Sequence, residues 1–304
     1  MTDEPITKSS AVPGNRWSRL ARLGSLAGGV AGNMLAEGAR QFAQGKRPQM
    51  QQLLLTPANA RRVADQLAQW RGAAMKVGQL LSMDAGELLP PELAEILSRL
   101  RAEAIPMPMS QVVSALHANW GEGWDRHFER FSFTPMAAAS IGQVHFGQRK
   151  DGRKVAVKIQ YPGIRRSIDS DVDNVATLLR VSGLLPKSLD IKPLLDEAKK
   201  QLHDEADYRR EGACMMQFAS LLADADEFIV PEMHEDLTTE NILAMTRLDG
   251  DAVETLIHQP QAERDRIVSQ LFRLLFREIF EFRLIQTDPN FANYRYAAAS
   301  QQLI

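Results

Sequence analysis

Apolar residues recur every three or four positions over the first part of the chain, which is the spacing of one helix face. The run between residues 57 and 104 follows this spacing and therefore predicts helix. The pair Pro90–Pro91 interrupts the run, and because proline fits a first helical turn, a new helix is expected over residues 92–104. A further helix is expected from Ser110 to Asn119. The periodic positions of the first run are Val63, Leu67, Trp70, Ala74, Val77 and Leu81.

The period changes after Phe131, where apolar residues begin to alternate with other residues. This alternation predicts a strand over Val155–Gln160 and a partner strand over Val144–Gln148. The intervening segment Lys150–Arg153 has Asp-Gly at its centre, which favours a tight turn between antiparallel strands. The sequence therefore predicts a β-hairpin here.

Helical and strand patterns both continue to the end of the chain, and together with the antiparallel hairpin they are typical of an α+β fold. The expected segments are helices at 168–179, 191–222 and 262–282, a strand-rich stretch at 227–248 centred on Phe228–Val230 and Ile242–Met245, and a loop at 286–290.

The composition narrows the class of protein. The 304 residues carry a net charge of −2, which argues against a nucleic-acid binder, because that function needs a strong basic excess. The single cysteine, Cys214, excludes an intramolecular disulfide framework and a multi-cysteine zinc site, and the six histidines lack ligand spacing. No apolar run reaches the roughly 18 residues that span a bilayer, and residues 1–10 are too polar for a signal peptide. We therefore expect a protein of a reducing, cytosolic compartment.

A basic amphipathic segment extends over Trp17–Leu35. Arginines and leucines each recur there at three-residue intervals, so that a helix would carry a basic stripe beside an apolar one. The segment has three interpretations: a helix that lies on an anionic membrane surface, a helix that packs on its own domain, or a flexible arm. The residues concerned are Arg16, Arg19, Arg22, Leu20, Leu23 and Leu26.

Lys158 is the first candidate for chemistry. It follows the apolar alternation of Val155-Ala-Val-Lys, so its ammonium projects from a strand with buried neighbours and calls for an anion. The same four-residue pattern marks the third strand of protein kinases, where the lysine contacts nucleotide phosphates. The alternative is an ordinary lysine on an edge strand.

The small residues Ala137, Ala138, Ala139 and Ser140 precede this hairpin at the place where a kinase carries a glycine-rich phosphate loop. Small side chains let backbone N–H groups approach a phosphate, but alanine restricts the positive φ values that glycine allows. Altered nucleotide binding is one interpretation, and a simple alanine-rich turn is the other.

Asp288 and Asn293 are separated by the spacing of a kinase catalytic loop, in which the Asp orients the acceptor and the Asn holds Mg²⁺. Upstream lie three acids in the predicted helix, Glu205, Asp207 and Glu211. The last two are four residues apart and share a helix face, whereas Glu205 points elsewhere. One acid is a candidate partner for Lys158, and the alternative is a solvated helix surface.

Lys76 and Gln79 lie three residues apart on one face of the first predicted helix. Gly78 between them costs about 1 kcal/mol relative to alanine in a helix, which suggests a packing or functional reason for the glycine. General kinase chemistry does not require this helix.

The ordered set of motifs resembles the atypical kinase-like family linked to ubiquinone biosynthesis, of the UbiB/ADCK type. The match extends from about residue 50 to the end of the chain. It is carried by Lys76-Val-Gly-Gln79, Ala137-Ala-Ala-Ser140, Val155-Ala-Val-Lys158, Glu205-Ala-Asp207 with Glu211, and Gln286-Thr-Asp-Pro-Asn-Phe-Ala-Asn293.

The resemblance implies a two-lobed protein-kinase-like fold with an N-terminal helical extension, and slow ATP hydrolysis in support of coenzyme Q production. By resemblance, Lys158 would contact the phosphates of ATP or ADP and pair with Glu211. Asp288 would be catalytic and Asn293 would bind Mg²⁺. The loop Ala137–Ser140 would tune nucleotide preference.

The resemblance also gives a role to the first helix. Lys76 and Gln79 would cover the site where a protein substrate enters, held through the acids Glu205 and Asp207. Membrane and isoprenoid-lipid association in the family favours membrane contact by the basic amphipathic segment.

The sequence departs from a kinase pattern in lacking the Asp-Phe-Gly motif that supplies a second Mg²⁺ ligand. We therefore expect a chain truncated within its C-terminal lobe, and its competence as an enzyme stays open. The expected parts are an N-terminal segment at 1–50, a helical extension at 51–130, a kinase-like N-lobe at 131–250 and the start of a C-lobe at 251–304.

Two functions follow as hypotheses. One is an atypical kinase-like, ATP-binding protein that supports ubiquinone biosynthesis, and the other is a catalytically impaired pseudokinase that binds lipid or acts as a scaffold. The expected partners are a nucleotide, a membrane lipid or isoprenoid quinone precursor, and ubiquinone-biosynthesis proteins, but no nucleic acid. The expected location is cytoplasmic, with peripheral attachment to the inner membrane as an option. The enzyme hypothesis requires Lys158 and Asp288 to face each other across one ATP-sized cleft.

Overall fold

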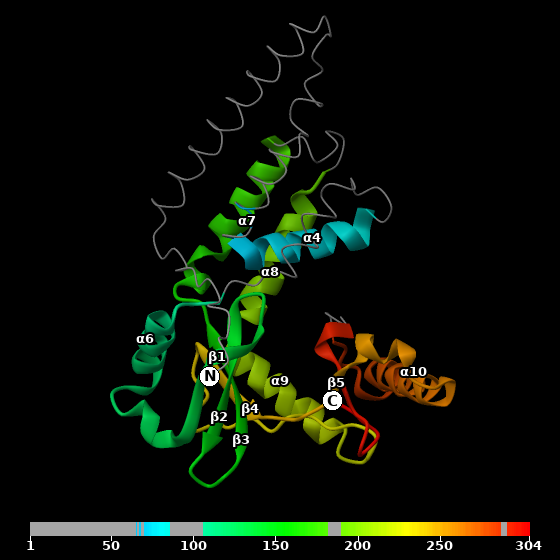
Figure 1. The fold of residues 1–304 in the computed structure, drawn as a ribbon. Coiled ribbons are helices and arrows are strands. Elements are labelled where there is room, and N and C mark those ends of the chain that lie inside the picture. The colour runs from blue at the N-terminus through cyan, green and yellow to red at the C-terminus, as the bar shows by residue number, and fades with distance from the viewer. Residues whose placement is uncertain (1–64, 66, 68–69, 86–105, 182–189, 287–290) are drawn as a thin grey trace, which may run out of the picture. The chain divides into compact units, whose positions relative to one another are not determined.

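The structure is a computed structural model that describes residues 65, 67, 70–85, 106–181, 190–286 and 291–304 (Figure 1). The chain divides into two compact units, which we call the first unit and the second unit. Of the described residues, the first unit comprises those up to Trp124 and those within Ser132–His145 and Lys158–Asp207, and the second unit comprises those within Asp125–Phe131, Phe146–Val157 and Tyr208–Ile304.

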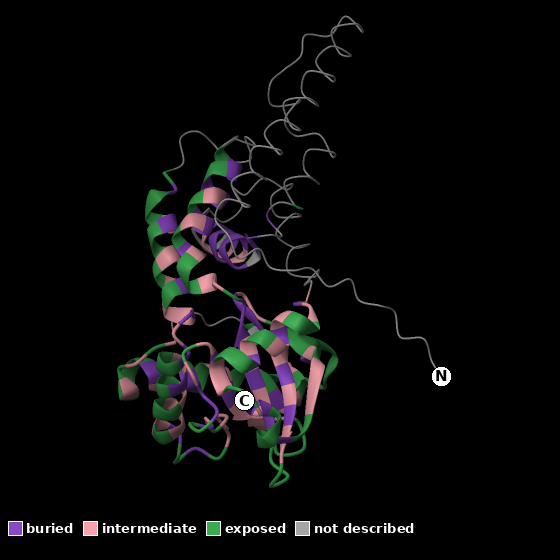
Figure 2. Cartoon of the chain, turned by 90° about the vertical axis from the view of Figure 1, so that its left-hand side faces the viewer, coloured by how far each residue is buried: buried purple, intermediate pink, exposed green. Residues whose placement is uncertain are grey.

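A four-stranded sheet has the order β1-β2-β3-β4, and its first three strands contribute residues to both units. In β3 the side chains of Val155, Val157 and Ile159 are fully buried, while the two residues between them are half-buried. Figure 2 shows buried positions recurring along the strands. Gly152 in the β2–β3 turn has a φ of 86°, which glycine adopts without strain, so the predicted Asp-Gly turn is confirmed. The strand bounds are β1 Phe128–Ala138, β2 Gly142–Arg149, β3 Lys154–Gln160 and β4 Ile242–Thr246.

Three helices of the first unit pack against one another, and they are α4, α7 and α8. Most described residues of α4 are buried, including Ala73, Val77 and Leu81, so this helix lies in the core of the unit. An ion pair from Lys199 to Asp173 and a 3.0 Å contact between His203 Nε2 and an Asp169 carboxylate oxygen join α7 to α8. The helix bounds are α4 Arg71–Ala85, α6 Met109–Trp120, α7 Ile164–Val181 and α8 Lys192–Glu205.

A buried polar chain links β2 to the segment before α6. The Gln143 side chain accepts the backbone N–H of Met107 at 2.8 Å and donates to His145 Nε2 at 2.7 Å. His145 Nδ1 lies 2.8 Å from the carbonyl oxygen of Ser132, which only accepts, so Nδ1 carries the proton. Burial lowers the pKa of His145, and the ring is therefore a neutral structural group.

The second unit combines helix α9, a long helical segment near the C-terminus and a small antiparallel sheet of order β5-β6-β7. Its core includes Leu222, Phe228, Leu274 and Leu303. Helix α10 continues directly into a π-helical turn, η5. The remaining bounds are η3 Trp124–His127, α9 Tyr208–Leu221, β5 Asp251–Ala252, η4 Val253–His258, α10 Gln261–Phe276, η5 Arg277–Phe282, η6 Phe291–Asn293, β6 Arg295–Ala297 and β7 Gln302–Leu303.

The predicted α+β class is confirmed, and the helices expected at 110–119 and 168–179 correspond to α6 and α7. The single helix expected at 191–222 is wrong, because α8 ends at Glu205 and α9 begins at Tyr208. The strand expected around Phe228 is also wrong, since Phe228 forms only an isolated bridge with Leu303.

Other expected elements are tested only in part. The helix expected at 262–282 is present as α10 followed by the π-helical turn. In the run at 57–104, the structure shows α4. The helix expected at 92–104, most of the loop at 286–290 and the segment Trp17–Leu35 lie outside the described residues. Among the helices that the structure describes, none combines the length and apolar character needed to cross a bilayer.

Candidate functional site

Lys76 places a positive charge inside the first unit. It lies on α4, its side chain is only 4% exposed, and its Nζ is 3.0 Å from Glu205 Oε1. The Gln79 Oε1 atom, one helical turn further, lies 3.5 Å from the same Nζ. An ammonium in such a place requires an anionic partner, and the last residue of α8 supplies it.

Glu205 also binds the connection between β1 and β2. The Ser140 hydroxyl donates to Glu205 Oε2 at 2.5 Å, while Oε1 faces Lys76. One carboxylate therefore joins three elements: helix α4, the β1–β2 connection and the end of helix α8. We call Lys76, Gln79, Ser140 and Glu205 the lysine–glutamate cluster.

Gly72 allows α4 to lie directly against the β1–β2 connection. A Cβ built on Gly72 would be 2.6 Å from the carbonyl oxygen of Ser140, closer than real Cβ atoms approach any group. The absence of a side chain at this position therefore sets the distance between the helix and the connection. The tight contact brings Lys76, one turn along α4, within reach of Glu205.

The four small residues do not form one loop. Ala137 and Ala138 are the last residues of β1 and are exposed, whereas Ala139 and Ser140 begin the connection to β2. The Ala139 N–H donates to the carbonyl oxygen of Gly142 at 2.9 Å and closes the turn. The prediction of a small-residue turn is thus right for its second half and wrong for its first, because β1, a strand that the sequence pattern does not predict, extends through Ala138.

Lys158 belongs to the same unit as the lysine–glutamate cluster. It is half-buried on β3 between the fully buried Val157 and Ile159. Two residues later, Gln160 Nε2 donates to the carbonyl oxygen of Ala206 at 2.7 Å, directly after α8. The N–H of Tyr161 donates to the Ile141 carbonyl oxygen at 2.9 Å. The end of β3 is therefore tied both to the β1–β2 connection and to the residue that follows Glu205.

Asp207 and Glu211 do not lie on one helix as predicted. Asp207 lies between α8 and α9, and Glu211 is in the first turn of α9. Both side chains are half-buried. Glu211 belongs to the second unit and Lys158 to the first, so their pairing stays a prediction.

The predicted metal and catalytic positions are described only in part. Asp288 lies outside the described residues, and Asn293 is exposed at the end of η6. Within the part of the chain that the structure describes, no three His, Cys, Asp or Glu side chains gather closely enough to hold a metal ion. The roles of Asp288 and Asn293 therefore stay predictions, and so does a cleft shared by Asp288 and Lys158.

Glu278 is a residue that the sequence analysis missed. Its side chain is 4% exposed, it accepts the backbone N–H of Gln286 at 3.2 Å, and burial raises its pKa. The Tyr294 hydroxyl donates to Gln286 Oε1 at 2.6 Å, and burial raises the Tyr294 pKa to about 12. The spacing of Ile267, Leu274 and Glu278 places this acid on the buried face of the helical segment. This spacing is the sequence signal that could have identified Glu278 as a buried acid.

Comparison with known proteins points to one family. The model of the ABC1 atypical kinase-like domain matches residues 99–304. The chain is 41% identical to "Atypical kinase COQ8, mitochondrial" of Saccharomyces cerevisiae, over 97% of this chain and 59% of the yeast protein. It is 42% identical to "Atypical kinase COQ8B, mitochondrial" of Rattus norvegicus, over 98% of this chain and 57% of the rat protein.

A solved structure is similar as well. The Rv3197–erythromycin complex from Mycobacterium tuberculosis has 31% sequence identity and a TM-score of 0.55, covering 76% of this chain and 59% of that one. The chain thus spans less than two thirds of the length of the curated relatives named above.

Proposed function

Because the chain belongs to the ABC1 atypical kinase-like family, we propose that it binds ATP and serves an atypical kinase-like function in ubiquinone biosynthesis. The family assignment supports a nucleotide partner. It also supports a role in ubiquinone biosynthesis similar to that of the COQ8 relatives. The finer assignment, an ATPase or a kinase acting on a small or lipid-linked molecule, rests on the residues of the first unit.

The observation that carries this proposal is the bridge that Glu205 makes between Lys76 and Ser140. In the proposed function, the β1–β2 connection lies against the nucleotide phosphates and Lys158 neutralises their charge. The bridge fixes that connection against α4, and α4 then covers the place where a protein substrate would enter. A covered entrance favours turnover of ATP or of a small acceptor over phosphorylation of a protein.

The residues of the first unit fit a nucleotide phosphate group. Lys158 is half-buried on a strand with two fully buried neighbours, and the proposal assigns its ammonium to the phosphates because a half-buried ammonium favours anionic surroundings. The exposed methyl groups of Ala137 and Ala138 leave the end of β1 open to a ligand. Ser140, by contrast, already binds Glu205, and we therefore give it a structural role.

The remaining assignments belong to the same proposal. Mg²⁺ would accompany ATP, with Asn293 as a ligand, Asp288 as the catalytic carboxylate and Glu211 as the partner of Lys158. The relatives are named as mitochondrial proteins, and the proposed setting of this chain is a membrane at which ubiquinone is made. The proposal also includes peripheral membrane contact through Trp17–Leu35. It further includes a lipid or an isoprenoid quinone precursor as a ligand.

Nucleotide titration of the full chain tests the proposal. We expect Lys158→Ala to weaken the binding of fluorescent ATP in the presence of Mg²⁺ by about tenfold or more, because a charge-assisted contact to phosphate is lost. The matched control is Lys154→Ala, which removes an exposed lysine from the start of the same strand and should leave the affinity unchanged. Equal affinities of wild type and Lys158→Ala would refute the assignment of the nucleotide site. Binding without ATP hydrolysis would favour the scaffold alternative.

A further inference from the structure

A cavity of about 910 Å³ lies in the second unit, away from every residue assigned above. Its apolar wall is formed by Met216 and Ala219 of α9 and by Val230, Pro231 and Met233 of the connection from α9 to β4. The volume is within the range of roughly 300–1,000 Å³ that small-molecule sites occupy. Methionine side chains are flexible and polarizable, so this wall can adapt to apolar ligands of different shape.

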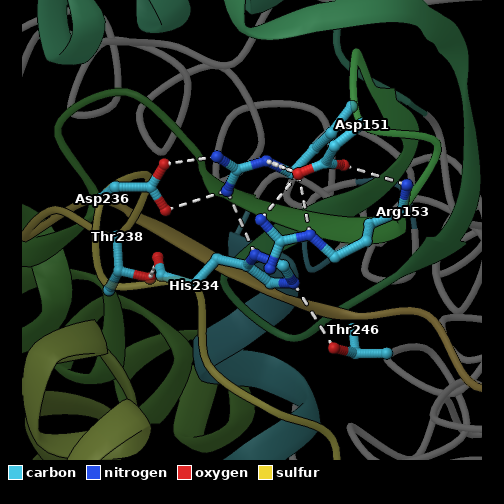
Figure 3. Close-up of polar contacts among 7 residues, drawn as sticks. Asp151, Arg153, His234, Asp236, Thr238 and Thr246 are labelled. Atoms are coloured by element: carbon cyan, nitrogen blue, oxygen red, sulfur yellow. Dashed lines mark hydrogen bonds and ion pairs between the residues drawn. The ribbon is translucent and has the colours of Figure 1, made fainter.

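Charged residues border the same cavity, and its two nearby arginines are already engaged (Figure 3). Arg149 donates two hydrogen bonds to Asp236, at 2.9 and 2.6 Å. Arg153 donates from Nε and one terminal nitrogen to Asp151, at 2.9 and 2.7 Å. The Arg153 guanidinium holds the pKa of Asp151 at about 2, so this carboxylate remains ionised. Each arginine therefore has a carboxylate of its own and is a poor site for a further anion.

His234 adds no positive charge to the border. It is 4% exposed, and its Nδ1 lies 3.1 Å from an Arg149 nitrogen, which can only donate. Nδ1 is therefore the bare nitrogen, and Nε2–H donates to the Thr246 hydroxyl at 3.3 Å. Burial is the largest cause that lowers the His234 pKa, followed by the charge of Arg149.

Two further carboxylates leave the border negative. Glu232 and Glu235 line the cavity and are exposed, and neither forms an ion pair within the described part of the chain. With Asp151 and Asp236 they outnumber the two guanidinium groups of Arg149 and Arg153. The lining residues alone, Glu232, Glu235 and Asp236 against Arg153, have the same excess of two negative charges, because Arg149 and Asp151 lie beside the cavity and cancel.

We propose that this cavity binds a small amphipathic organic cation, in which an ammonium group is joined to an apolar alkyl or aryl body. The ammonium lies near Glu232 and Glu235, and the apolar body packs on Met216 and Met233. An anion of the same shape is disfavoured because both arginines are engaged, and a neutral analogue gains only the apolar contacts. The proposal is independent of the nucleotide site, since none of its residues has a role there.

Octylamine, octanoate and octanol are matched probes, because they share the apolar body and differ in the charge of the head group. The full chain carrying isotope-labelled methionine methyl groups is titrated with each probe and followed by NMR. We expect octylamine to bind about tenfold more tightly than octanoate and to shift the Met216 and Met233 methyl signals. The signals of the exposed Met109 and Met136, which do not line the cavity, should stay in place.

Substitutions test whether Glu232 and Glu235 cause the preference for a cationic head group. The double variant Glu232→Gln with Glu235→Gln should lower octylamine affinity about tenfold and leave octanol affinity unchanged. Glu254→Gln, an exposed acid on η4 that does not line the cavity, is the control and should change neither. Lys158→Ala should keep octylamine binding, which separates this proposal from the nucleotide site. Equal affinities for octylamine and octanoate, or methyl shifts confined to other methionines, would overturn it.

Discussion

Lys76 and Glu205 are unequal partners, because they are buried to different extents. The Lys76 side chain is 4% exposed and that of Glu205 is 27% exposed. Removing the carboxylate leaves a charge in the core of the first unit. Removing the ammonium leaves a carboxylate that still accepts a hydrogen bond from Ser140 and reaches water. The cost of breaking this pair should therefore depend on which partner is removed.

We expect Glu205→Gln to lower the free energy of unfolding by about 3 kcal/mol, as for a buried pair that loses one member. Lys76→Met should cost about 1 kcal/mol or less, because an apolar side chain of similar length fills the same space. Urea denaturation of both variants measures the two values. A larger loss for Lys76→Met than for Glu205→Gln would contradict this account.

An exposed pair on α8 provides the control. Lys192 and Asp196 are 77% and 61% exposed and their charged atoms lie 3.4 Å apart. Exposed pairs contribute little, so Asp196→Asn should change the unfolding free energy by about 0.5 kcal/mol at most. The residue types of the lysine–glutamate cluster are evident in the sequence. Their contact is implied only by the family resemblance and by no local pattern, because it joins positions far apart in the chain.

At the scale of elements, Gly72 determines how closely α4 approaches the β1–β2 connection. Gly72→Ala would bring Cβ to 2.6 Å from a backbone oxygen, which cannot rotate away as a side chain can. We expect a loss of about 1–3 kcal/mol in unfolding free energy, because the helix or the connection must shift. If the connection lies at the nucleotide phosphates, ATP affinity should fall as well. Thermal unfolding and nucleotide titration measure the two effects.

Gly121 provides a contrast to Gly72. A Cβ on Gly121 meets nothing within 4 Å, but its φ of 77° is one that other residues rarely adopt. Gly121→Ala should therefore cost stability through backbone strain alone and leave ATP affinity unchanged. If both alanine variants lower ATP affinity equally, crowding at the β1–β2 connection is not the cause.

The break between α8 and α9 shows where prediction of the elements from sequence fails. No glycine or proline marks the break, and the helical pattern continues from Ile191 to Leu222. The structure ends α8 at Glu205 and binds the carbonyl oxygen of Ala206 to the Gln160 side chain. A contact with a distant strand thus accompanies the interruption, and local periodicity contains no signal for it.

At the scale of the whole molecule, the α+β class and the strands with apolar alternation could be predicted. Strand β1 could not, because it is at the end of the strand order and most of its side chains are exposed or half-buried. The sheet β5-β6-β7 was missed for a different reason. Its strands are two or three residues long, which is too short for any period to be read.

The cluster around His234 was also beyond sequence analysis, because it joins the β2–β3 hairpin to the segment before β4. Its residues are ordinary surface types when considered singly. Only the fold reveals that Arg149, Asp236 and the buried His234 form one hydrogen-bonded group (Figure 3). Charged groups that pair across long sequence separations leave no periodic signal.

Buried histidines give the whole molecule a predictable response to pH. Burial lowers the pKa values of His145 and His234 below the ordinary value of 6.5. As the pH falls below 6.5, the unfolded chain takes up protons that the folded chain still excludes. The contribution of these groups to stability is therefore complete above pH 6.5 and is lost as the pH falls toward their folded-state pKa values.

His234→Gln should weaken this response, because glutamine does not titrate. The variant loses stability at about pH 7.5 through its altered hydrogen bonds, but its further loss between about pH 7.5 and about pH 5.5 should be smaller than that of the wild type. Urea denaturation at both pH values gives the difference, in which the contributions of Glu278 and the other acids cancel. A His234→Gln variant with the full wild-type loss would mean that folding does not lower the His234 pKa, and the effect assigned to its burial would then be wrong.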